Sequence, residues 1–123
     1  MRVFGATLFA LIILTAGAAH AQGPGSYVAS RGFYSGPLIL YANYVASDTC
    51  QKVVSMRRGA PGGRAVGPDT IPVTVTIGPN PRGCGKNRLV TGTMPIGGPQ
   101  SLIQLFFVDQ SGRLLKTEKI SKR

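Results

Sequence analysis

Clusters of glycine and proline interrupt this chain so often that no long helix fits between them. Fifteen of the 17 glycines and all nine prolines follow residue 21, and they gather at 23–25, 59–68, 78–85 and 95–99. Glycine adopts positive φ readily and proline lacks a backbone donor, so both residues mark the ends of regular elements. The runs between the clusters are short and rich in Val, Ile, Leu, Thr, Tyr and Phe. Such runs favour strands, and the pattern predicts an all-β domain.

Six or seven strands are expected, with turns every eight to twelve residues. The candidate runs are 27–34, 37–46, 51–57, 70–77, 88–96, 101–108 and 113–122. In the run 70–77 the four residues Ile71, Val73, Val75 and Ile77 fall on one face, which indicates one buried and one wet side. In the run 51–57, strict alternation places Lys52, Val54 and Met56 together.

The run 101–108 is apolar on both faces, and Asp109 to Gly112 follow it as a turn before the return strand. A doubly apolar strand is expected at the centre of a sheet or covered on both sides; at an edge it would be an interface. The whole pattern predicts a small two-layer antiparallel β-sandwich. An immunoglobulin-like topology is one form of this fold, although the core tryptophan typical of it is missing here. A small closed barrel is the alternative.

The first 21 residues have the pattern of a secretory signal peptide. Arg2 precedes an apolar run from Val3 to Ala16, and Ala19-His20-Ala21 has the form of a cleavage site. The run is shorter than the roughly 20 residues of a membrane-spanning helix. We therefore expect residues 1–21 to be removed as a signal helix. Residues 22–123 then form a single exported domain, periplasmic or extracellular, without a transmembrane segment.

Removal of that segment would also remove His20, the only histidine, and the chain has no tryptophan. Nucleophile systems built on histidine and histidine-based zinc sites would then be excluded. Four scattered acids remain for acid–base chemistry, namely Asp48, Asp69, Asp109 and Glu118. We therefore expect no catalytic residues, cofactor or metal, with a small Asp- or Glu-dependent enzyme as an alternative hypothesis.

Cys50 and Cys84 are the only cysteines. In an oxidising compartment such a pair forms a disulfide, and no Cys-x-x-Cys pattern or mature-chain histidine suggests a reactive thiol. Cys84 lies among glycines, so the bond is expected to pin a loop to the start of the strand that Cys50 opens.

The formal net charge is +10. Two basic loops are candidate anion-binding sites, because guanidinium groups and glycine-freed N–H groups hold phosphates or carboxylates. The first contains Arg57, Arg58 and Arg64, and the second contains Arg82, Lys86 and Arg88 around Cys84. Solvated surface charge is the alternative interpretation of both.

The C-terminal Lys116, Lys119, Lys122 and Arg123 form a basic tail, either leaning on an anionic surface or simply solvated. The leading hypothesis is a non-enzymatic exported protein. It would bind an anionic envelope polymer, a lipid headgroup or a protein partner through its Arg-rich loops, without a nucleic-acid partner. A protein-interaction or inhibitor module that uses the strand within 102–108 is the second hypothesis.

Overall fold

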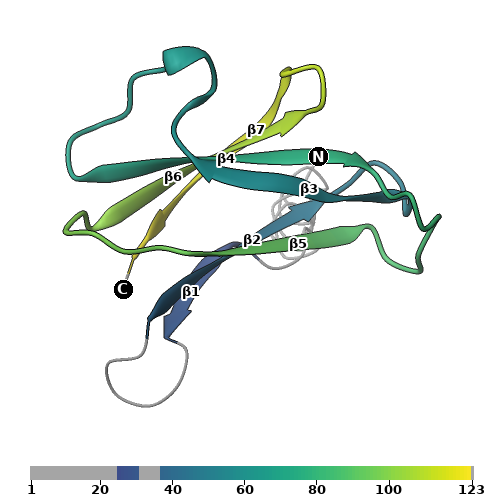
Figure 1. The fold of residues 1–123 in the computed structure, drawn as a ribbon, viewed down its shortest axis with the longest axis horizontal. Coiled ribbons are helices and arrows are strands. Elements are labelled where there is room, and N and C mark those ends of the chain that lie inside the picture. The colour runs from purple at the N-terminus through teal and green to yellow at the C-terminus, as the bar shows by residue number, and fades with distance from the viewer. Residues whose placement is uncertain (1–24, 31–36, 123) are drawn as a thin grey trace, which may run out of the picture.

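A computed structural model describes residues 25–30 and 37–122. The expected signal segment 1–21 and part of the expected strand 27–34 lie outside these residues. The strands are β1 (Tyr27–Ser30), β2 (Leu38–Val45), β3 (Gln51–Arg58), β4 (Thr70–Pro79), β5 (Leu89–Pro95), β6 (Leu102–Asp109) and β7 (Leu114–Ser121), with one 3-10 turn, η1 (Pro61–Gly63) (Figure 1). Within the described part of the chain, no helix is long and apolar enough to cross a membrane.

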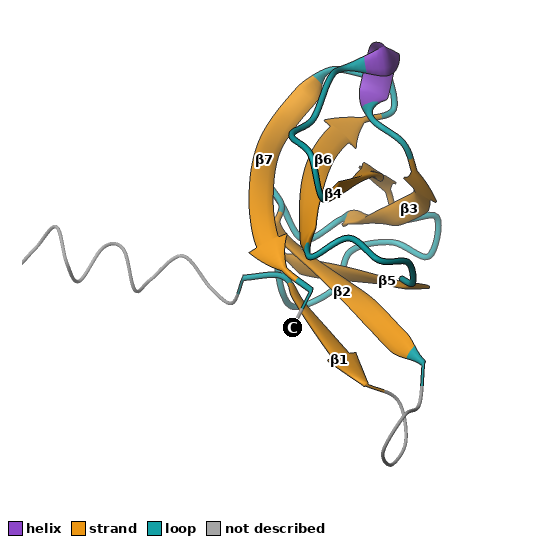
Figure 2. Ribbon diagram, turned by 90° about the vertical axis from the view of Figure 1, so that its left-hand side faces the viewer, coloured by secondary structure: helices purple, strands orange, loops and turns teal. Residues whose placement is uncertain are grey.

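The strands form two sheets that pack face to face, which confirms the predicted β-sandwich. One sheet has the order β1-β2-β5 and the other has the order β3-β4-β6-β7 (Figure 2). Every adjacent pair is antiparallel, as predicted, except β4 and β6, which run parallel and so depart from the predicted antiparallel pairing. The parallel pair arises because β5 lies in the opposite sheet. The chain therefore crosses the sandwich twice between β4 and β6 and returns in its original direction.

The core lies between the sheets, and β4 supplies one wall of it. Ile71, Val73, Val75 and Ile77 are each at most 4% exposed, as their alternation predicts. The opposite face of β4 is less wet than expected, because Thr74 is 3% exposed and its hydroxyl donates to the Gly59 carbonyl at 2.7 Å. The connection between β3 and β4 therefore covers part of the outer face of the four-stranded sheet.

Strand β6 is central in its sheet, between β4 and β7. Ile103, Leu105 and Phe107 are fully buried on the inner face, while Phe106 and Val108 on the outer face are each 4% exposed. Apolar residues on both faces thus place this strand at the centre, as expected. The strand has no free edge, so its burial does not favour its use as an interface.

Two close contacts join the sheets along their sides. On one side β5 approaches β3 at Gly92, where a Cβ would lie 2.6 Å from Val53 Cγ1. On the other side the Glu118 carboxylate accepts hydrogen bonds from the Ser26 N–H at 2.9 Å and from the Ser26 hydroxyl at 2.8 Å. These contacts fix the positions of the edge strands β3 and β7.

Strand β3 contains a β-bulge, with a register shift between Val53 and Ser55. The expected grouping of Lys52, Val54 and Met56 on one face is therefore wrong. Val53 and Met56 both pack against the core, three residues apart. A bulge inserts one extra residue into a strand, so the faces are exchanged beyond it.

Candidate functional site

All four acidic side chains form hydrogen bonds with other residues of the chain. Asp48 accepts the Cys50 N–H at 2.7 Å and Asp69 accepts the Ser101 N–H at 3.1 Å, while Glu118 holds Ser26. Asp109 forms the one ion pair of the described residues, at 3.5 Å from Arg113. Among the described residues, the other Lys and Arg side chains have no carboxylate within ion-pair distance.

The first basic cluster is divided between two faces. Arg57 pairs with Thr74, which in turn pairs with Phe106, so all three lie on the outer face of the four-stranded sheet. The Arg64 guanidinium lies over the same Phe106 ring, 6.0 Å from its centroid. Arg58 pairs with Val73 of the core face, so it belongs to the other side of β3. The structure thus brings Arg57 and Arg64 together and separates Arg58 from them.

The second basic cluster lies in the connection between β4 and β5, and three constraints hold this segment. The predicted disulfide between Cys50 and Cys84 is confirmed. The Gly85 N–H donates to the Thr49 carbonyl at 2.7 Å, and the Ala46 N–H donates to the Arg88 carbonyl at 2.8 Å. The bond joins two connections at one end of the sandwich, as expected. Arg82, Lys86 and Arg88 are all exposed on this pinned segment.

The two basic clusters do not converge. The pinned segment is at the Cys50 end of β3, whereas the connection that carries Arg64 leaves its other end (Figure 1). Eight extended residues separate these ends, about 25 Å at a rise of roughly 3.3 Å per residue. Lys52, the second residue of β3, lies at the Cys50 end on the outer face, because its partner Gly78 is on the opposite side of β4 from buried Ile77. We call Arg57, Arg64, Lys52, Arg82 and Lys86 the β3 track.

Lys52 is a candidate site residue that reasoning from the sequence missed. Strict alternation would place it on the same face as Arg58, and only the bulge brings it to the face of Arg57. The sequence feature that could have pointed to Lys52 is its place as the first cationic residue after Cys50.

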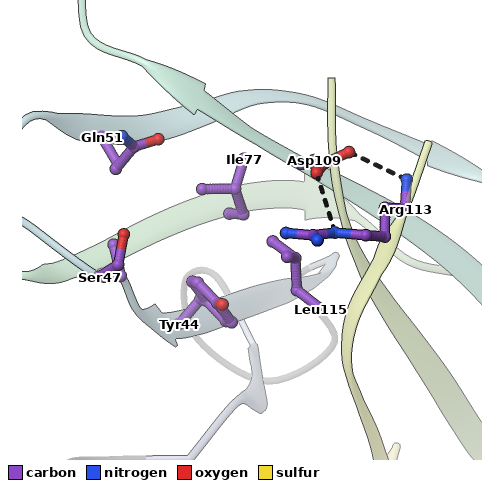
Figure 3. Close-up of a pocket in the computed structure, with 8 residues that line it drawn as sticks. Tyr44, Ser47, Gln51, Ile77, Asp109, Arg113 and Leu115 are labelled. Carbon is purple, nitrogen blue, oxygen red and sulfur yellow. Dashed lines mark hydrogen bonds and ion pairs between the residues drawn. The ribbon is translucent and has the colours of Figure 1, made fainter. Parts of the chain in front are cut away.

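A cavity of about 260 Å³ opens between the sheets at the same end as the disulfide (Figure 3). Tyr44 and Ser47 form one wall, Gln51 and Ile77 form another, and the turn between β6 and β7 closes it. The Tyr44 ring stacks on the core residue Phe107, with 5.2 Å between centroids. The cavity therefore combines an aromatic base with a few polar side chains.

Asp109 is the one acid that lines this cavity. Hydrogen bonds from the Ser111 hydroxyl and from the Arg113 N–H lower the pKa of Asp109 below its ordinary value of 3.8. Asp109 is therefore ionised at neutral pH and acts as an acceptor that shapes its own turn. A general acid needs a raised pKa, so the shift is opposite to that role.

The C-terminal lysines differ from one another. Lys116 and Lys119 are exposed on β7, as a solvated strand would have them. Lys122 is 8% exposed and buried in the fold, so it is not part of a solvated tail. Arg123 lies outside the described residues.

Within residues 25–30 and 37–122, no group of three or more His, Cys, Asp or Glu side chains is close enough to hold a metal ion. Comparison with known proteins adds no assignment: no family model, no curated protein and no solved structure matches this chain.

Proposed function

We propose that this protein is an exported, cationic β-sandwich that binds an acidic polysaccharide of the cell envelope along the β3 track. The proposal includes no catalysis. The main observation in support of the proposal is that each of the four acidic side chains accepts hydrogen bonds from residues of the same chain.

The four acidic side chains accept hydrogen bonds within the fold, and only one of them pairs with a cation among the described residues. Most of the positive charge at the surface of the described chain is therefore not neutralised by a neighbouring carboxylate. In most soluble domains, Lys and Arg are interspersed with Asp and Glu, and the opposite charges partly cancel. Here the exposed cations of the described chain face solvent almost without such partners. A positive surface field raises the local concentration of polyanions and speeds their association.

The linear arrangement of the cations favours an extended ligand over a compact one. Arg57 and Arg64 at one end of β3, and Lys52 with the disulfide-bonded segment at the other, span roughly 25 Å. A single phosphate or carboxylate cannot contact both ends, whereas a chain of repeating uronate units can. The disulfide and the Arg64–Phe106 contact limit the motion of the two ends, which lowers the entropic cost of binding.

Export is supported by the same disulfide, because a disulfide in a small domain is compatible with an oxidising compartment. The signal pattern at residues 1–21 is the second support for export.

The test is binding of fluorescently labelled polygalacturonate at 50 and 150 mM NaCl. The double variants Arg57→Gln/Arg64→Gln and Arg82→Gln/Lys86→Gln each remove two charges from one end of the track. At roughly 1 kcal/mol per cation near an anionic surface, each should weaken binding about tenfold or more at low salt. Affinity of the unaltered protein should fall as salt rises.

The matched control is Lys116→Gln/Lys119→Gln, which removes the same charge from β7 at the opposite edge of the sheet. It should change the affinity less than threefold. Equal losses in all three double variants would show that only net charge matters and would refute the track. Tighter binding to phosphatidylglycerol vesicles than to the polysaccharide would replace the polymer with a membrane.

A further inference from the structure

Lys122 lies outside the β3 track and, unlike the other described Lys and Arg residues, is buried. Lysine is almost never fully buried without a partner, yet Lys122 is 8% exposed at the end of β7. Burial of a charged group is unfavourable unless it is paired and hydrogen-bonded. The surroundings of its ammonium group therefore decide what it does.

The described surroundings supply carbonyl oxygens and no carboxylate. The Lys122 backbone N–H donates to the Ser101 carbonyl at 2.8 Å, which ties the end of β7 to the start of β6. The ammonium donates to the Gly98 carbonyl. An ammonium has three donors, and Glu118, the acid on the same strand, already accepts two hydrogen bonds from Ser26. Among the residues that the structure describes, Lys122 is thus held by backbone carbonyls and has no carboxylate as an ion-pair partner.

A second cation approaches the same glycine. A Cβ on Gly98 would lie 3.5 Å from the Arg58 guanidinium, so this side chain reaches the connection between β5 and β6 from β3. Arg58 is the arginine that the bulge turns away from the track. The connection that follows β5 is therefore bordered by two positive groups.

A cavity of about 270 Å³ lies against Lys122. Pro37 and Leu38 at the start of β2 and Pro95 and Ile96 at the end of β5 form its apolar walls. The Ile96 N–H donates to the Leu38 carbonyl at 3.0 Å, so the two walls are joined through the backbone. Gly97 and Gly98 line the rest and bring no side chain into the space.

We propose that this cavity binds a small carboxylic acid with an apolar body, such as a short alkanoate. The carboxylate accepts a hydrogen bond from the Lys122 ammonium, and the hydrocarbon packs against Leu38 and Ile96. The ligand supplies the counter-charge that the described residues do not supply. Small-molecule sites range from roughly 300 to 1,000 Å³, so this volume restricts the ligand to small acids.

The test compares octanoate with 1-octanol, which has the same chain length and no charge, by NMR titration of the oxidised protein. The methyl groups of Leu38 and Ile96 should shift with octanoate. The unaltered protein should bind octanoate about tenfold or more tightly than octanol, because a charge-assisted hydrogen bond forms only with the acid. Equal affinities, or shifts confined to other methyl groups, would overturn the proposal.

Variants test whether the Lys122 ammonium causes the preference for octanoate over octanol. Lys122→Met keeps the length of the side chain and removes the charge, and it should bind octanoate and octanol equally. Lys119→Met, an exposed position on the same strand, should keep the preference for octanoate. If Lys122→Met does not fold, Lys122→Arg provides the second measurement and should retain a preference for the acid. Loss of the preference in Lys119→Met, or its persistence in Lys122→Met, would refute the role of Lys122.

Discussion

Gly92→Ala is expected to destabilise this protein, although alanine usually suits a strand better than glycine. Gly92 faces the core from β5, opposite Ala42 of β2. A Cβ at this position would lie 2.6 Å from both Val53 Cγ1 and Met56 Sδ, and 3.1 Å from Val53 Cβ. Met56 has a long flexible side chain and can move away, but the β-branched Val53 is stiff. The added methyl group must therefore push β5 and β3 apart.

The expected magnitude is the difference between two effects. Overpacking of a core by a methyl group costs about 1–3 kcal/mol. Replacement of glycine by alanine restricts the unfolded chain and returns about 0.4–1 kcal/mol. The difference runs from about 0 to 2.6 kcal/mol, and the mid-range values give a net loss of about 1.3 kcal/mol in the free energy of unfolding.

The assay is equilibrium unfolding in urea, followed by circular dichroism. For an m value of about 1–3 kcal/mol per molar urea, the midpoint should fall by roughly 1 M. Gly97→Ala is the matched control, because no heavy atom lies within 4 Å of the position of its Cβ. It should leave the midpoint unchanged or raise it slightly.

A second substitution separates the steric clash from other causes. Val53→Ala removes one of the two atoms closest to the new methyl group, so it should cost less in the Gly92→Ala background than in the unaltered protein. Gly92→Ala with a midpoint equal to that of Gly97→Ala would refute the close approach of β5 to β3. Full additivity of the two substitutions would assign the loss to something other than this contact.

Two further predictions concern the disulfide and Asp109. Replacement of both Cys50 and Cys84 by serine should lower the free energy of unfolding by about 3–4 kcal/mol, because the bond closes a long loop; an unchanged urea midpoint would contradict this. Since the pKa of Asp109 is lowered in the folded state, its contribution to stability is present above its ordinary pKa of 3.8 and is lost as the pH falls through the lowered value. The stability difference between the unaltered protein and Asp109→Asn should therefore shrink from pH 5 to pH 2, and a difference independent of pH would count against the carboxylate.

Most of the fold could be predicted because strand signals are local. The expected run 101–108 corresponds to Leu102–Asp109, and 70–77 corresponds to Thr70–Pro79. Glycine and proline clusters end strands through backbone sterics, which depend only on near neighbours. The parallel pairing of β4 and β6 could not be predicted, since it depends on which sheet receives β5.

The candidate site could be predicted less completely, because the sequence shows which residue types are present, whereas only the folded chain shows which of them lie close together. The sequence indicates that arginines flank a glycine-rich turn and that Lys122 belongs to a basic terminus. It does not indicate that Arg57 and Arg64 share Phe106, or that Lys122 is buried beside a cavity. These contacts join residues far apart along the chain, so no local pattern reports them.

The sequence by itself determined the all-β architecture, the positions of the turns, the pairing of Cys50 with Cys84 and the excess of positive charge. The tertiary structure alone decided which cations lie on the same face of β3. The bulge between Val53 and Ser55 lets both Val53 and Met56 reach the core, and it thereby moves Arg57 to the face of Lys52 and Arg58 to the other side. The physical reason is that alternation along a strand is fixed by the backbone, whereas the register that assigns each face is set by packing against a second sheet.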